Sequence, residues 1–143
     1  MLYGLEAGKY RLALKTPKDQ IINVEYTRDK SKKKAAYKKS KAIHLKSDID
    51  SIYTSTEKAA RWYKVSVSST KKRKAVTLSK DSVGGGFKFC VYQKGKRLKT
   101  VKVTKNDKVK TVKLPKKKGA YYVKVTKLTS KTTGAYYLGT YTY

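Results

Sequence analysis

Apolar side chains recur at every second position in several short segments of this sequence. In residues 61–68, Tyr63 and Val65 alternate with lysine and serine, which is the period of a strand with one buried face. Residues 87–92 and 120–126 repeat the alternation. Turn-forming residues separate such segments at intervals of about eight to twelve residues, a spacing typical of sandwiches and barrels. The sequence therefore predicts an all-β protein, built as an antiparallel β-sandwich or jelly roll.

The chain divides into three segments. Residues 1–28 carry two strand patterns around a turn and predict a β-hairpin, residues 29–41 predict a lysine-rich linker, and residues 42–143 hold the main domain. Residues 8–14 and 119–125 share one pattern: glycine, any residue, tyrosine, any residue, apolar, any residue, apolar. We interpret the hairpin as the end of a preceding tandem repeat; chance similarity between β-hairpins is the alternative. Since a lone hairpin is marginal in water, we expect it to pack on the main domain or to belong to a longer parent protein.

Lysine dominates the charge of the chain. Lys and Arg total 37 against 9 Asp and Glu, which gives a net charge of +28. Lysines run along nearly the whole sequence, whereas a nucleic-acid-binding protein is expected to concentrate its charge on one face. Only five of the basic residues are arginine, whose planar guanidinium group suits phosphates and base edges better than the lysine ammonium group does. We expect an extracellular or cell-wall polyanion or polysaccharide as partner, and no specific nucleic acid; a dedicated nucleic-acid or polyanion site is the alternative.

Residues suited to catalysis or metal binding are scarce. The chain has one cysteine, Cys90, and one histidine, His44, so it lacks the ligand spacing of a zinc site. Cys90 lies in an apolar alternation and predicts a packed thiol, whereas His44 predicts a solvent-facing side chain. The glycines at 84–86 lack the Lys-Ser/Thr of a phosphate loop and predict a flexible turn. We expect no enzyme activity, no cofactor and no metal site.

Tyrosine is the most frequent aromatic residue, with 13 copies against two Phe and one Trp. Exposed tyrosine beside lysine can stack on sugars or bases and attract anions, although tyrosine is also a good strand residue with a polar handle. We expect Trp62 to be a core anchor. The candidate binding face comprises Tyr122, Lys124, Lys127, Tyr137 and Tyr141.

Short motifs in residues 42–143 carry a family resemblance through their order. They are Arg-Trp-Tyr-Lys-Val-Ser-Val at 61–67, Ala-Val-Thr-Leu at 75–78, Phe-Lys-Phe-Cys-Val-Tyr at 87–92, Leu-Pro at 114–115, Gly-Ala-Tyr-Tyr-Val-Lys-Val at 119–125 and Gly-Ala-Tyr-Tyr-Leu at 134–138. This order resembles the bacterial pre-peptidase C-terminal domain family. The resemblance implies a jelly-roll-like accessory domain, found beside secreted peptidases and in surface proteins, that binds substrate or matrix without catalysis. Many relatives carry an acidic Asp-x-Asp pair, a candidate calcium site, where this chain has Phe87, Lys88 and Phe89. Lysine does not ligate calcium, so we carry no calcium site over.

These features predict a non-catalytic accessory module of a secreted or cell-surface bacterial protein, for adhesion or for binding extracellular polymer, carbohydrate or substrate. The alternative is a nucleic-acid or general polyanion-binding module. No stretch is long and apolar enough to span a membrane. No signal peptide is visible after Met1. For an exported protein we expect the signal to have been removed, or the chain to be a piece of a longer one.

Overall fold

Nine strands and one short 3₁₀ helix make up the regular structure of the described residues. The computed structural model describes residues 9, 11, 13–15, 18–24, 35–46, 48–54, 60–81, 85–132 and 135–143, with the backbone alone for 48–54 and 81. In chain order the elements are η1 (Lys39–Lys41), β1 (Ile43–His44), β2 (Asp48–Thr54), β3 (Arg61–Val67), β4 (Lys74–Asp81), β5 (Phe87–Gln93), β6 (Lys96–Val103), β7 (Val109–Lys113), β8 (Gly119–Lys127) and β9 (Ala135–Thr142).

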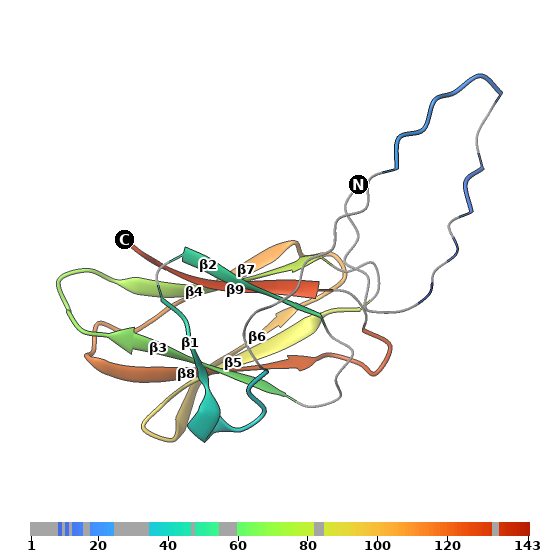
Figure 1. Ribbon diagram of the computed structural model, residues 1–143. Helices are drawn as coiled ribbons and strands as arrows, with labels where there is room; N and C mark the ends of the chain where they lie inside the picture. Colours follow the sequence, from blue (N-terminus) through green and yellow to red (C-terminus); the bar gives the residue numbers. More distant parts are fainter. Residues whose placement is uncertain are drawn as a thin grey trace.

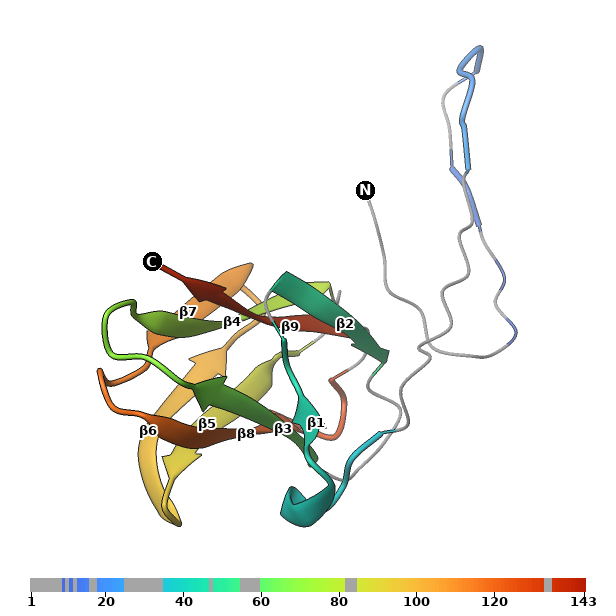
Figure 2. The ribbon, with the colours of Figure 1, turned by 60° about the vertical axis from the view of Figure 1, so that its left-hand side comes forward.

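The strands form two sheets that stack face to face (Figures 1 and 2). The five-stranded sheet has the order β1-β3-β8-β5-β6, and the four-stranded sheet has the order β2-β9-β4-β7. Strands β2 to β9 reproduce the jelly-roll arrangement of eight strands in two sheets. Strand β1 adds a fifth strand by pairing parallel to β3, and every other pairing among the described strands is antiparallel. The predicted all-β sandwich or jelly roll is confirmed.

Alternate residues of both sheets fill the space between them. Five side chains that represent the two sheets have no exposed surface: Val65, Leu78, Phe89, Val123 and Leu138. Their neighbours along each strand face outward, so the period of two in the sequence produces the two layers. Burying one such aliphatic or aromatic side chain contributes about 1.5–3 kcal/mol. The core is therefore the main source of stability for a chain whose exterior charges repel one another.

A hydrogen bond between two buried tyrosines links the sheets. The hydroxyl oxygens of Tyr63 in β3 and Tyr136 in β9 lie 2.7 Å apart, and these residues are 0% and 3% exposed. The Phe87 ring packs edge-on against the Tyr136 ring, with centroids 4.9 Å apart. Buried hydroxyls require partners because water does not reach them. This bond therefore helps to fix the position of one sheet over the other.

The loops after β4 and β8 approach closely at one end of the sandwich. A Cβ built on Gly86 would lie 2.1 Å from the Val103 carbonyl oxygen. The Thr132 hydroxyl donates a hydrogen bond to the Gly86 carbonyl over 3.0 Å. Gly85 has φ +78°, a left-handed conformation that glycine adopts without strain. Where the sequence predicts a flexible turn, Thr132 thus holds Gly85 and Gly86 against the body of the sandwich.

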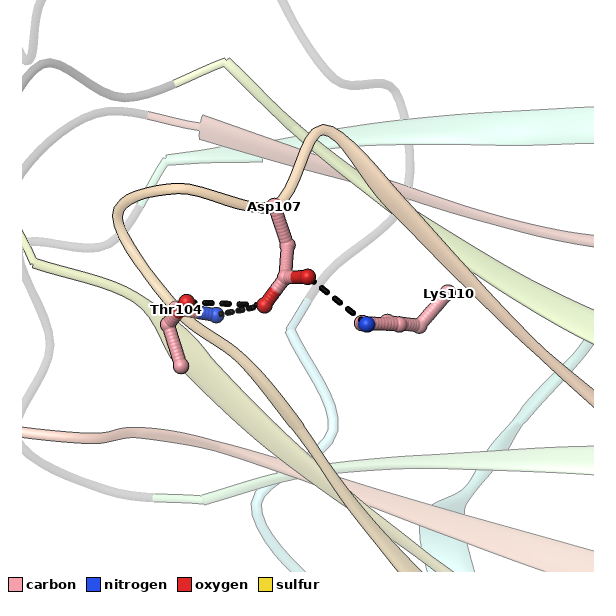
Figure 3. A network of polar contacts seen from close by, with 3 residues as sticks. All are labelled: Thr104, Asp107 and Lys110. Atoms are coloured by element: carbon pink, nitrogen blue, oxygen red, sulfur yellow. Dashed lines mark hydrogen bonds and ion pairs between the residues drawn. The ribbon is translucent and has the colours of Figure 1, made fainter.

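Two of the turns between strands have a clear local cause. Lys94 and Gly95, between β5 and β6, have φ 47° and 79°, as a two-residue type I′ hairpin requires. Between β6 and β7, Asp107 accepts hydrogen bonds from the Thr104 backbone N–H (2.9 Å) and hydroxyl (2.8 Å), and pairs with Lys110 Nζ at 2.7 Å (Figure 3). The Lys110 contact first, and the Thr104 donors second, lower the pKa of Asp107 to about 2. Asp107 thereby fixes the turn that carries the chain from one sheet to the other.

Only part of the predicted hairpin at residues 1–28 lies among the described residues. Lys18 and Asp19 form a turn there, with φ 68° at Asp19. The neighbouring described residues are not in strands, and Ile21 is 93% exposed. The rest of the hairpin lies outside the described residues, so the hairpin and its relation to a tandem repeat stay predictions.

The second half of the predicted linker at 29–41 packs on the sandwich. Ala36 is buried, and its carbonyl accepts a hydrogen bond from the Trp62 backbone N–H over 2.8 Å. The helix η1 follows and leads into β1. Residues 29–34 lie outside the described residues. The described contacts of 35–41 therefore extend the main domain to the N-terminal side of the boundary predicted at residue 42.

Candidate binding face on the five-stranded sheet

Three aromatic rings lie on the outer face of the five-stranded sheet. Because Tyr63 and Val65 point into the core, their neighbour Trp62 points outward. The same alternation turns Tyr92 of β5 and Tyr122 of β8 outward. All three outward rings are half-buried. The prediction that Trp62 is a core anchor is wrong, because its position in β3 places it on the side opposite the buried residues.

The strand register interleaves these rings with basic side chains. Lys64, Tyr122 and Tyr92 are direct neighbours across β3, β8 and β5. Two residues along, Trp62 lies opposite Lys124, and the Trp62 and Tyr92 ring centroids are 5.5 Å apart with a tilt of 44°. Side chains directly opposite one another have Cβ atoms about 4.5–5.5 Å apart, so these groups form one connected surface. We call it the ring face: Lys39, Trp62, Lys64, Tyr92, Tyr122 and Lys124.

Ammonium groups lie over two of the rings. Lys124 Nζ is 5.5 Å from the Trp62 ring centroid, and Lys39 Nζ is 4.7 Å from the Tyr122 ring centroid. Both distances are within the range of a cation–π attraction. Lys39 belongs to η1, which lies beside β3 because the Ala36 carbonyl bonds to Trp62. An anionic group that approaches the ring face therefore meets aromatic surface and positive charge together.

Cys90 lies among the outward-facing residues of this sheet, yet it is only 5% exposed. The predicted packing of the thiol is confirmed, but Cys90 faces away from the main core, with Sγ 3.3 Å from Thr100 Oγ1. Burial first, and the Cys90 thiol second, raise the pKa of Tyr92, whereas Arg97 lowers it. His44 is exposed, as predicted. Three strand spacings, about 14 Å, separate β1 from β5 in the sheet order, so His44 and Cys90 do not form a nucleophile–base pair.

The five predicted binding residues do not share one surface. Tyr122 and Lys124 lie on the ring face. Tyr137 and Tyr141 face outward from β9, on the opposite side of the sandwich, because Tyr136 and Leu138 occupy the core. At the end of β8, Lys127 continues the inward row and lies opposite Phe87. The predicted face is therefore divided between two surfaces and the end of a strand.

Strand alternation alone is enough to identify Trp62 and Tyr92 as outward-facing residues, since each is flanked in its strand by core residues. No pattern in the sequence identifies Lys39 as part of this surface. Its place beside Tyr122 depends on how the segment before β1 folds back onto the sheet, and no local pattern in a lysine-rich segment specifies that contact.

The four-stranded sheet carries a smaller ring cluster on its own outer face. The Tyr141 and Tyr143 centroids are 5.8 Å apart, and Lys113 Nζ is 5.3 Å from the Tyr143 ring centroid. Gly139 leaves the middle of β9 without a side chain. Among the described residues, this face has one ammonium group over a ring, whereas the ring face has two.

Metal-ligating side chains do not gather in the part of the chain that the structure describes. No three His, Cys, Asp or Glu residues lie together there as a metal site would require. Within the same residues, no helix has the length and apolar character needed to cross a membrane.

Comparison with known proteins adds no relative to this picture. No protein-family model matches the sequence, and no curated protein matches it. The resemblance of residues 42–143 to the pre-peptidase C-terminal domain family therefore stays a prediction.

Proposed function

We propose that the protein is a non-catalytic accessory module of a secreted or cell-surface bacterial protein, and that its ring face binds an extracellular anionic polysaccharide. The observation that carries this proposal is the interleaving of three half-buried rings with two lysines of the five-stranded sheet and with Lys39 of η1. Sugar rings present C–H surfaces that pack on aromatic rings. Acidic groups along the polymer would pair with the ammonium groups beside those rings.

Two kinds of contact would contribute to such binding, and they differ in their response to salt. Exposed lysine–carboxylate pairs contribute about 0.2–1 kcal/mol each, and salt screens them. Ring contacts rest on apolar burial, which sodium chloride screens little. Binding through the ring face should therefore weaken as salt is raised but retain a component that depends on the rings.

Binding to polygalacturonate, a polymer of uronic acid, tests the proposal. We would compare Tyr122→Ala with Tyr141→Ala, which removes the same ring from the opposite sheet, in low salt and in about 1 M NaCl, where the screening length falls to about 3 Å. The proposal expects Tyr122→Ala to lose most of the binding that remains in high salt and Tyr141→Ala to keep it. Equal losses in the two variants, or no binding left in high salt for the parent protein, would contradict it.

A nucleic-acid or general polyanion-binding module is the second candidate. The net charge of +28 and the rings beside lysine favour it, because bases also stack on aromatic residues. Exposed lysines also cover β6, β7 and the loops, rather than one stripe. Single-stranded DNA distinguishes the two candidates. If it binds more tightly than polygalacturonate in high salt, and through Tyr122, the second candidate replaces the first.

A further inference from the structure

Three loops carry only positive charge and lie at one end of the sandwich. They join β3 to β4, β5 to β6 and β7 to β8; the first and last lie on the left in Figures 1 and 2, on the side of the C-terminal residue. We call the basic residues of 71–73, 94–97 and 116–118 the basic end. There are three in each range, nine in all, and every one is exposed. Segments 68–74 and 93–97 contain no Asp or Glu, and neither does 113–119.

The strand register brings the three loops together. Val67 at the end of β3 pairs with Gly119, and Gln93 at the end of β5 pairs with Tyr121. The ends of β3, β8 and β5 are therefore neighbours and span about 10 Å. The screening length at physiological salt is about 8 Å. The nine cations consequently repel one another, and no acidic residue within these loops offsets the repulsion.

Hydrogen bonds hold the backbone of two loops of the basic end in place. The buried Tyr121 hydroxyl donates a hydrogen bond to the Lys117 carbonyl over 2.9 Å, and the Lys117 N–H donates to the Pro115 carbonyl over 2.7 Å. Arg73 and Tyr143 exchange two backbone hydrogen bonds, of 3.0 and 2.9 Å. These bonds hold the loops at 71–73 and 116–118 in place, so a bound anion would relieve the repulsion between their charges.

The opposite end of the sandwich differs in both charge and connection. Asp107 lies in the loop there and pairs with Lys110. The segment that precedes the domain also joins it there, since Ala36 bonds to Trp62 near the start of β3. The described part of this segment, residues 35–41, therefore joins the sandwich away from the basic end.

We infer that the basic end is a second docking surface and that it binds a linear phosphodiester polymer without bases. A polymer with repeated anionic groups can contact all three loops at once. The three basic ranges contain no aromatic residue on which bases could stack. The rings beside them, Tyr92 opposite Arg97 and Tyr143 beside Arg73, belong to the outer faces of the two sheets. Lysine attracts phosphate as a point charge without reading a sequence. The basic end adjoins the ring face at Arg97, which lies opposite Tyr92, whereas the basic residues of 71–73 and 116–118 lie in loops outside the ring face.

Short poly(glycerol phosphate) is the probe that tests this inference on the full chain. The test variant is Lys116→Glu/Lys117→Glu/Lys118→Glu. The matched control is Lys105→Glu/Lys108→Glu/Lys131→Glu, which makes the same charge change in exposed loop residues of the opposite end. We expect the test variant to lose at least about tenfold in affinity and about two to three units of salt slope, and the control to lose less than about threefold.

Three results would overturn the inference. One is an equal loss in both triple variants, which would mean that total charge alone governs binding. Another is single-stranded DNA binding at least about tenfold more tightly per phosphate, which would identify a nucleic-acid partner. The third is loss of poly(glycerol phosphate) binding in Tyr122→Ala but not in the test variant, which would assign the polymer to the ring face. If the glutamate variant does not fold, the Lys→Gln triple variants carry the same comparison.

Discussion

The hydrogen bond between Tyr63 and Tyr136 allows a quantitative test of how the two sheets are joined. We would replace each tyrosine with phenylalanine, alone and together. The 2.7 Å oxygen–oxygen distance and the near-complete burial of both residues place this bond away from water. A buried hydrogen bond contributes about 0.5–1.5 kcal/mol net. Each single variant should therefore lose about 0.5–1.5 kcal/mol of unfolding free energy.

The double variant distinguishes this bond from the other contacts of the two residues. The double variant breaks the same single hydrogen bond that each single variant breaks, so the combined loss should be smaller than the sum of the single losses. We expect a coupling energy of about 1 kcal/mol, within the range measured for residues in contact. Other contacts of either tyrosine cancel in the cycle, provided that each substitution leaves them unchanged.

Urea unfolding followed by circular dichroism measures these free energies, with an unchanged m-value as the check on two-state behaviour. The control cycle pairs Tyr63→Phe with Tyr141→Phe, since Tyr141 is exposed on the outer face of the other sheet and should not couple. A Tyr63/Tyr136 coupling below about 0.3 kcal/mol, the level of additive sites, would refute the account of how the sheets are joined.

Three further predictions concern the core, a loop contact and a turn. Leu78→Ala, at a fully buried position, should cost about 2–5 kcal/mol in chemical denaturation; a loss below about 1 kcal/mol would mean that Leu78 is not in a packed core. Gly86→Ala forces a Cβ against the Val103 carbonyl and should cost about 1–3 kcal/mol; a loss below about 0.5 kcal/mol, the level of an ordinary surface substitution, would contradict this close approach. The lowered pKa of Asp107, about 2 in the folded protein, means that its stabilising contribution is present above about pH 4 and is lost as the pH falls toward 2. Asp107→Asn should therefore have a lower melting temperature than the parent protein at neutral pH, and its melting temperature should fall less on acidification. Identical acid profiles for variant and parent would contradict this.

Periodicity predicted the sheets well because side-chain alternation and sheet geometry share the same period. The turns at Lys94-Gly95 and at Asp107 were also predictable, since left-handed glycine and turn-forming Asp act locally. The parallel pairing of β1 with β3 could not be predicted, because the two residues of β1 are too few to form a pattern that specifies a partner strand.

The candidate site was predicted only in part, for a reason of topology. Alternation says which residues of one strand share a side, but it does not say which sheet that strand joins. Tyr122 and Tyr137 show the same local pattern of adjacent tyrosines, yet β8 and β9 belong to different sheets. Their side chains therefore face opposite directions. Sheet membership depends on long-range pairing, which no segment of the sequence encodes by itself.

The most direct test of the central claim uses the single tryptophan of the chain. Trp62 lies on the ring face, so its fluorescence reports that surface without any label. We predict that polygalacturonate, added in about 1 M NaCl to screen the distant lysines, produces a saturable change in Trp62 emission and protects it from quenching by acrylamide. Emission and quenching that stay constant, while the polymer is shown independently to be bound, would contradict the claim that the outer face of the five-stranded sheet binds polymer.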